Sequence, residues 1–131
     1  MGTADLTYGG AVPALVEVVP ELRDALNEHM RDNDEILPHV FFGCDVVPFV
    51  LDAWERGRAN VLARCLAFLD AAMASPDPST RELVAISFVE SVGPWDPAMA
   101  DFIAIWPQAL AEEAAAQVGQ RQYSHPYSQA G

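Results

Sequence analysis

Apolar residues recur at spacings of three and four along most of the chain, as expected for α-helices that each bury one face. In the first such stretch the apolar positions are Leu15, Val18, Val19, Leu22, Leu26 and Met30. Pro20 interrupts this stretch, and because proline cannot donate a backbone hydrogen bond, a helix should restart there. The pattern therefore predicts a short helical lead-in from Pro13 and a main helix over residues 20–32.

The next segments alternate between turn residues and helical patterns. Residues 35–43 contain a proline and a glycine and predict a buried loop or a short helical turn. Asp45 is the expected N-cap of a helix that ends near Gly57. The helix that follows, residues 58–74, has a wide apolar face and is expected to be central.

Proline-marked breaks delimit the remaining helices. Ser79 and Glu82 have the spacing of a capping box, which predicts a helix start there, and Gly93 is expected to end that helix. Asp96, which is followed by a proline, predicts the next start. The last helix is expected to run to Gly119.

No segment alternates strictly between apolar and polar residues, as a half-buried strand would. The fold class is therefore expected to be all-α, a compact bundle of about six or seven short helices, with stacked helical hairpins as the alternative arrangement. The helical domain is assigned to residues 13–119. Residues 1–12 and 120–131 have no core pattern and are expected to form a flexible N-terminal arm and a flexible C-terminal tail.

The chain is strongly acidic, with a net charge of −12, but 51% of its 131 residues are hydrophobic, enough to form a buried core. The 19 acidic residues are opposed by seven basic ones, all of them arginine. This balance argues against nucleic acid and anionic membranes as partners, since both are bound through clustered basic residues. It favours a basic protein partner, because complementary charge speeds association, although net charge can also serve solubility alone.

No targeting or membrane-spanning segment is expected. Residues 1–12 lack the basic start of a signal peptide, and no uncharged apolar run approaches the roughly 18 residues of a membrane span. Cys44 and Cys65 form no disulfide framework, and Cys65 lies among apolar residues, as a buried thiol would. The cytoplasm is the predicted compartment.

The strongest candidate for function is a row of acidic residues on the predicted helix that buries Leu22 and Leu26. At about 100° per residue, the face opposite these leucines carries Glu17, Glu21, Asp24, Glu28, Asp32 and Glu35. Like charges four residues apart destabilise a helix by about a few tenths of a kcal/mol per pair. One explanation for a row of acidic residues that costs stability is that this surface binds cations. An ordinary solvated face is the other.

The segment that follows this helix is a second candidate. Residues 31–45 combine acids with a histidine, a cysteine and two phenylalanines, as binding loops often do. Equally, the phenylalanines could fill the core while the acids solvate the helix end. The residues expected to bind a protein partner are Glu28, Asp32, Asp34, Glu35 and His39.

Neither a metal site nor a catalytic centre is predicted, and no cofactor is expected. The histidines and cysteines match no metal-ligand spacing, and no nucleotide-binding or hydrolase motif is present. Ser87 and Ser91 lie in a buried helical pattern without a paired histidine.

Two segments carry a family resemblance. Residues 29–47 match the pattern "DN…LLPH…GD" at Asp32, Asn33, Leu37, Pro38, His39, Gly43 and Asp45. Residues 80–93 match "ELVxxSFxE" at Glu82, Leu83, Val84, Ser87, Phe88 and Glu90. Cys44 is an insertion relative to the first pattern. Over roughly residues 14–118 the chain resembles an uncharacterised family of small bacterial proteins.

Proteins of this kind are similar in size, acidity and helical content to the immunity proteins of bacterial toxin systems. The resemblance implies a cytoplasmic inhibitor that occludes the active site of a cognate toxin, basic around its cleft, with carboxylates mimicking phosphates if the toxin is a nuclease. Two alternatives stay open. One is a structural or regulatory subunit with an exposed apolar face around Trp54 or Trp106, and the other is a small ligand-binding domain or enzyme that uses His39 and Asp34. The sequence leaves the oligomeric state open.

Overall fold

The computed structural model describes the backbone of residues 6–130 and the side chains of residues 6–121. Over that range every regular element is helical, which confirms the all-α fold class. In chain order the elements are α1 (Ala11–Val18), η2 (Pro20–Leu22), α2 (Arg23–Asn33), α3 (Pro38–Phe41), η3 (Phe42–Val46), α4 (Val47–Glu55), α5 (Ala59–Met73), α6 (Pro78–Val84), η4 (Ala85–Glu90), η5 (Pro97–Met99), α7 (Ala100–Ile103) and α8 (Gln108–Ala130). Within the described residues, no helix combines the length and the apolar composition needed to cross a membrane.

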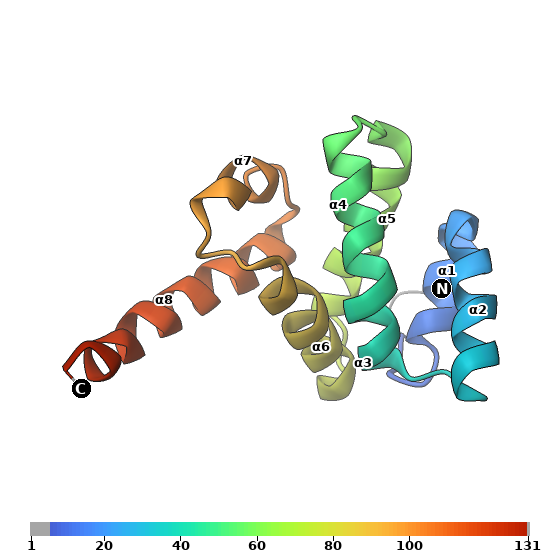
Figure 1. The fold of residues 1–131 in the computed structure, drawn as a ribbon, viewed down its shortest axis with the longest axis horizontal. Helices are drawn as coiled ribbons and strands as arrows, with labels where there is room; N and C mark the ends of the chain where they lie inside the picture. Colours follow the sequence, from blue (N-terminus) through green and yellow to red (C-terminus); the bar gives the residue numbers. More distant parts are fainter. Residues whose placement is uncertain (1–5, 131) are drawn as a thin grey trace.

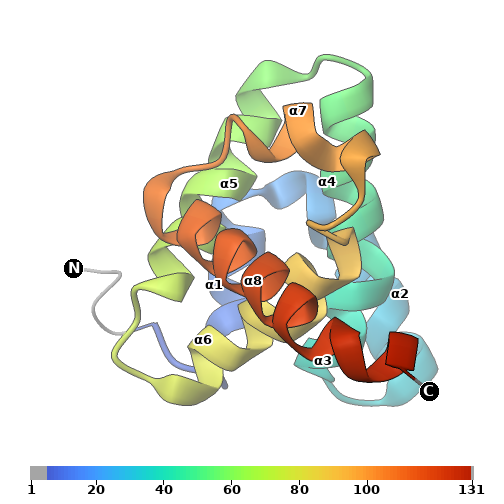
Figure 2. The ribbon, with the colours of Figure 1, turned by 90° about the vertical axis from the view of Figure 1, so that its left-hand side faces the viewer.

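The helices follow one another across the molecule in roughly the order of the sequence (Figure 1). α1 and α2 lie on one side, the α4–α5 hairpin stands in the middle, and α6 and α8 lie on the other side, with the end of α8 projecting beyond the other helices. Seen from that side, α8 crosses in front of α6 (Figure 2). Because α5 contacts α1, α4, α6 and α8, the central position predicted for it is confirmed.

The largest completely buried side chains are four phenylalanines: Phe41, Phe42, Phe88 and Phe102. Phe41 and Phe42 stand at the junction of α3 and η3, and Phe88 belongs to η4, which packs against both segments. Burying a side chain of this size stabilises the fold by roughly 1.5–3 kcal/mol. The contact between these two helical segments is therefore a main part of the core.

Two long helices each contain a π-helical turn. The chain is helical without a break over residues 38–55, through η3, and over residues 78–92, through η4. Such turns are rare in globular proteins and are often found at functional sites. The prediction that Asp45 caps a new helix is wrong, because Asp45 lies inside η3 and the helix has already begun.

The two π-helical segments are joined by a polar contact as well as by packing. His39 Nδ1 lies 2.6 Å from Ser87 Oγ, so the prediction that Ser87 lacks a paired histidine is wrong. The backbones also approach each other, since a Cβ atom at Gly43 would lie 4.0 Å from the Ser87 carbonyl oxygen. Residues from both resemblance segments therefore meet at one junction.

Two helix ends follow the glycine signals in the sequence, but the start of α6 does not follow the predicted signal. Gly57 and Gly93 have positive φ angles of 69° and 81° and stand at the helix ends predicted for them. The predicted capping box is wrong, because Asp77 Oδ1 accepts the hydrogen bond of Ser79 N at 3.0 Å. α6 begins one residue before Ser79, at Pro78, where proline loses no intrahelical hydrogen bond.

Part of the expected N-terminal arm is held against the domain. Leu6 is buried, and its carbonyl oxygen accepts a hydrogen bond from Ser75 Oγ at 2.7 Å. Tyr8 N donates to Asp77 Oδ2 at 2.9 Å. Residues 1–5 lie outside the described residues.

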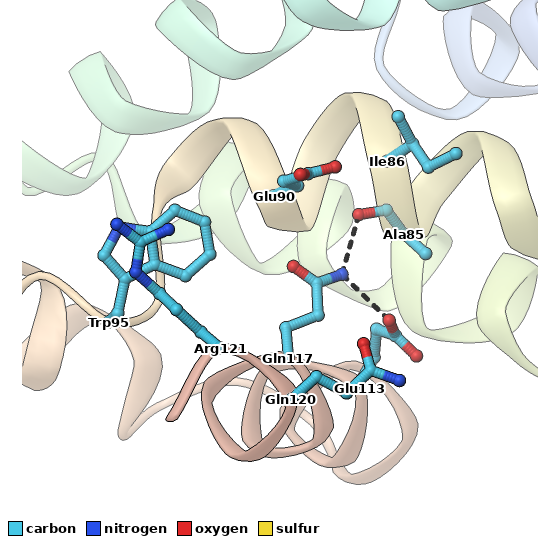
Figure 3. A pocket seen from close by; sticks show the side chains of 8 residues that line it. All are labelled: Ala85, Ile86, Glu90, Trp95, Glu113, Gln117, Gln120 and Arg121. Carbon is cyan, nitrogen blue, oxygen red and sulfur yellow. Dashed lines mark hydrogen bonds between the residues drawn. The ribbon is translucent and has the colours of Figure 1, made fainter. Parts of the chain in front are cut away.

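α8 is longer than predicted, since it runs to Ala130 instead of ending at Gly119. A glycine inside a helix costs about 1 kcal/mol, so Gly119 weakens α8 without ending it. The first half of α8 packs on η4, where Gln117 Nε2 donates to the Ala85 carbonyl oxygen at 2.9 Å (Figure 3). The flexibility expected of residues 120–131 stays a prediction.

Candidate functional site

An acidic groove lies between α2 and η3 and has a volume of about 330 Å³. Three of its lining side chains are carboxylates, Glu28 and Asp32 from α2 and Asp45 from η3. In the part of the chain that the structure describes, none of the three forms an ion pair with a basic side chain. The groove therefore gathers uncompensated negative charge from two separate elements.

The pKa of Asp45 reflects this environment. Burial raises the pKa of the Asp45 carboxyl above its ordinary value, and the negative charge of Glu28 raises it further, while His29 acts in the opposite direction. No hydrogen bond donor among the described residues offsets these effects. The ionised form of Asp45 is therefore less stable in the folded protein than in water.

His29 fixes one wall of the groove. Its side chain is only 5% exposed, and its Nε2 accepts a hydrogen bond from Leu37 N at 2.9 Å. Its ring lies edge-on to Phe41, with 5.5 Å between the ring centroids, and Asn33 Nδ2 donates to the His29 carbonyl oxygen at 2.9 Å. The contacts with Leu37 and Phe41 tie α2 to the residue before α3 and to the last residue of α3, so buried contacts hold this wall of the groove.

Two of the five residues predicted to bind a partner, Glu28 and Asp32, line the groove. The other three lie outside it and are exposed. Asp34 follows α2 in the left-handed conformation, with φ 65°, and Glu35 comes next in the loop. His39 belongs to α3 and is bonded across to η4.

Asp45 completes the groove but is not among the predicted site residues, because aspartate is a favoured N-cap residue and the sequence analysis assigns it to a helix start. A signal was present in the apolar spacing. Phe42, Val46 and Val50 are four residues apart and all completely buried, as in a continuous helix. That spacing places Asp45 within the helix, one residue before a buried position.

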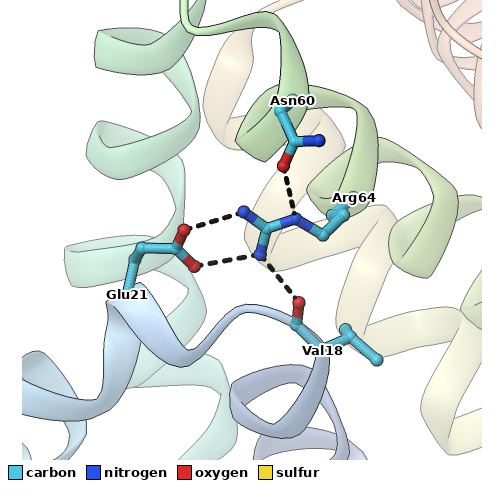
Figure 4. Close-up of polar contacts among 4 residues, drawn as sticks. All are labelled: Val18, Glu21, Asn60 and Arg64. Atoms are coloured by element: carbon cyan, nitrogen blue, oxygen red, sulfur yellow. Dashed lines mark hydrogen bonds and ion pairs between the residues drawn. The ribbon is translucent and has the colours of Figure 1, made fainter.

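The first part of the predicted acidic row faces a different neighbour (Figure 4). Arg64 of α5 binds both carboxylate oxygens of Glu21, at 2.7 and 2.9 Å, and also donates to the Val18 carbonyl oxygen and to Asn60 Oδ1, each at 2.9 Å. The hydrogen bonds from Arg64 to the Glu21 carboxylate, helped by a backbone hydrogen bond, lower the pKa of Glu21 to about 2. The helix is interrupted between α1 and Pro20, and Glu21 therefore turns toward α5. The prediction of one continuous acidic face is wrong.

The His39–Ser87 pair has the separation that a serine nucleophile and its base require. Ser87, however, is only 7% exposed, and among the described residues no carboxylate bonds to His39, whose ring instead lies 5.8 Å from that of Tyr8. The pair therefore joins α3 to η4 and lacks the third group of a catalytic triad. The described residues also contain no group of three or more potential ligands arranged to hold a metal ion.

The tryptophans do not form the exposed apolar face that an oligomeric subunit was expected to show. Trp106 is only 6% exposed and packs against Phe88 and Phe102, with ring centroids 5.6 and 5.4 Å apart. Trp54 is partly buried, with its ring 5.3 Å from that of Phe102. Both side chains belong mainly to the core.

Comparisons with known proteins test only the family resemblance of residues 29–47 and 80–93. No curated protein and no solved structure matches the chain. A family model described as a domain of unknown function, DUF7674, matches residues 12–122 and so includes both resemblance segments and the acidic groove. Since this match spans most of the sequence, the chain belongs to the DUF7674 family.

Proposed function

We propose that the chain is a protein-binding module of the immunity type, which neutralises a cognate bacterial toxin by covering its active site. One observation carries this proposal. Carboxylates from α2 and η3 border a single groove, and no basic side chain among the described residues pairs with them. Keeping like charges together opposes folding, and a basic partner that supplies the opposite charge explains why the arrangement exists.

The groove suits one basic side chain at the centre of a larger contact. An arginine or lysine entering it would meet Glu28 and Asp32 on one wall and Asp45 on the other. Charge pairs that lose contact with water at the centre of an interface contribute to affinity, whereas pairs at its rim mainly increase the association rate. Asp34 and Glu35, exposed in the loop after α2, would act at this rim.

Asp45 gives the proposal a pH signature. A cation bound in the groove favours ionised Asp45, so binding lowers the pKa that burial and Glu28 have raised, and a proton is released. Affinity should therefore increase as pH rises through the raised pKa of Asp45 and then become constant. An Asp45→Asn variant should lose the contribution of Asp45, so its affinity should depend less on pH than that of the original chain.

Co-expression tests the function directly. The chain is produced together with the product of the adjacent upstream gene, and growth and co-purification are measured. A neighbour that is toxic alone, and is both bound and neutralised by this chain, supports the inhibitor. A harmless neighbour that does not bind refutes inhibition of that neighbour.

A charge-reversed pair of variants tests the groove. Glu28→Lys with Asp32→Lys should weaken binding of the purified partner by at least about tenfold, most strongly at low salt. Glu55→Lys with Glu82→Lys makes the same change of net charge at two exposed positions elsewhere and should bind nearly as the original chain does. Equal loss in both variants would show that net charge, and not the groove, determines binding.

A further inference from the structure

A second pocket, of about 410 Å³, lies between η4 and α8, on elements other than those of the acidic groove. Its wall on the η4 side includes Glu90 and the exposed side chain of Ile86, Trp95 borders one end, and α8 contributes Glu113 and Gln117. In Figure 3 the side chains of Gln117 and Arg121 extend from α8 toward η4 and Trp95. With Gln120, which also lines it, the pocket combines an aromatic ring, two carboxylates and two amides.

One cation already lies at this pocket. The guanidinium carbon of Arg121 is 4.3 Å from the centroid of the Trp95 ring, which is within the range of a cation–π contact. Arg121 forms no ion pair with a described residue, although Glu90 lines the same pocket. The Trp95 face therefore accepts a guanidinium group, while the nearby carboxylate of Glu90 remains without a cationic partner among the described residues.

The polar groups around Trp95 are mainly acceptors. Gln117 uses its amide nitrogen for two hydrogen bonds, to the Ala85 carbonyl oxygen at 2.9 Å and to Glu113 Oε2 at 2.8 Å. Its amide oxygen is buried and accepts no hydrogen bond from the described residues. A buried acceptor without a donor is uncommon in folded proteins. Together with the carboxylate of Glu90, it calls for a ligand that donates several hydrogen bonds.

We propose that this pocket binds the guanidinium group of an arginine side chain from another molecule, and that Arg121 is an internal competitor for the Trp95 face. A guanidinium is planar, can stack on an indole ring and carries five N–H donors in a fixed arrangement, which suits an aromatic ring flanked by acceptors. An incoming arginine displaces Arg121 from Trp95 and donates to Glu90 and to Gln117 Oε1. The site is separate from the α2–η3 groove and does not depend on the function proposed for that groove.

Titration with a small probe tests this site without a protein partner. N-acetyl-arginine amide is added to ¹⁵N-labelled protein, and the signals of the Trp95 indole N–H and the Gln117 side-chain amide are followed. Both should shift together and saturate. Citrulline amide, acetylated in the same way, has nearly the shape of the arginine probe without its charge and should cause no saturable shift.

Two variants separate the role of Arg121, the internal competitor, from that of Glu90, which binds the incoming guanidinium. Arg121→Ala should bind the arginine probe about 2- to 5-fold more tightly, because the internal cation is gone. Arg56→Ala makes the same charge change at an exposed residue outside the pocket and should bind as the original chain does. In the Arg121→Ala background, Glu90→Gln should weaken binding, whereas Glu55→Gln should not.

Three results would overturn the proposal. The first is the absence of a saturable shift in folded Arg121→Ala protein at about 50 mM probe, a concentration that reveals even weak binding. The second is equal binding of the citrulline probe. The third is unchanged affinity on Glu90→Gln. Each of these leaves the result of the toxin co-expression test unaffected, so the two proposals fail separately.

Discussion

Replacement of His29 by leucine tests whether a buried histidine holds the wall of the acidic groove. Leucine is apolar and fits within the space of the imidazole, but it cannot accept the hydrogen bond that Leu37 N donates to His29 Nε2 at 2.9 Å. It also removes the edge-on ring contact with Phe41, whose centroid lies 5.5 Å away. The substitution therefore removes two contacts of α2, one with the residue before α3 and one with the last residue of α3, without creating a large cavity.

The expected loss can be worked out from these two contacts. A partly buried N–H group left without an acceptor costs about 1–2 kcal/mol, at the lower end of the range for buried groups. The ring contact contributes about 0.5–1.5 kcal/mol beyond the area that it buries. The more apolar leucine offsets part of the sum, so the free energy of unfolding should fall by about 1–3 kcal/mol.

Urea unfolding followed by far-ultraviolet circular dichroism measures this loss. For a domain of this size, a fall of about 2 kcal/mol moves the unfolding midpoint by roughly 1 M urea. Asn27→Leu is the matched control, because it adds the same side chain at an exposed position of the same helix and should change stability by less than about 0.5 kcal/mol. If His29→Leu is as stable as this control, His29 does not hold α2 against α3, and other contacts position the wall of the groove.

Three further predictions rest on single residues. Gly93→Ala should lower stability by about 1–2 kcal/mol in thermal unfolding, because φ is 81° there and a Cβ atom strains that conformation. Arg64→Met should make the melting temperature depend less on pH in the acid range. Bonding to Arg64 lowers the pKa of Glu21 from 4.5 to about 2, so the original chain loses the stability that this pair contributes as pH falls through that window. The variant lacks the pair and therefore has no such loss. In native protein, dithionitrobenzoate should react with the exposed Cys44 but with Cys65 only after unfolding, because burial raises the pKa of the Cys65 thiol to about 12.

The positions of the helices could be predicted from the sequence because their ends depend on local chemistry. Pro20 lies at the break between α1 and α2, and Asp96 accepts the hydrogen bond of Ala98 N, as its position before a proline predicts. At Ser79 the same reasoning chose the wrong cap. Asp77 also satisfies the capping requirement, and it accepts a hydrogen bond from distant Tyr8 that no local pattern could reveal.

The groove could be predicted only in part, because it depends on how two elements meet. Glu28 and Asp32 were found from helical periodicity alone. Asp45 required the π-helical turn η3, which contains Cys44, the insertion relative to the family pattern. Each residue of an α-helix advances by about 100°, so an added residue would turn the rest of the helix away from the core unless a wider turn absorbs it. η3 is such a turn, and Phe42 and Val46 on either side of Cys44 both remain buried.

The direction of each pKa shift separates carboxylates that the fold uses from one that it does not. The pKa values of Glu21 and Asp77 are lowered, because the Arg64 side chain bonds the first and backbone N–H groups the second, so their negative charges stabilise the folded state. The pKa of Asp45 is raised by burial and by Glu28, so its negative charge opposes folding. A charge that opposes folding in the free protein becomes favourable when a cation binds next to it. The acidic groove between α2 and η3, and not the ion pair of Glu21 with Arg64, is therefore the surface to test against a basic partner.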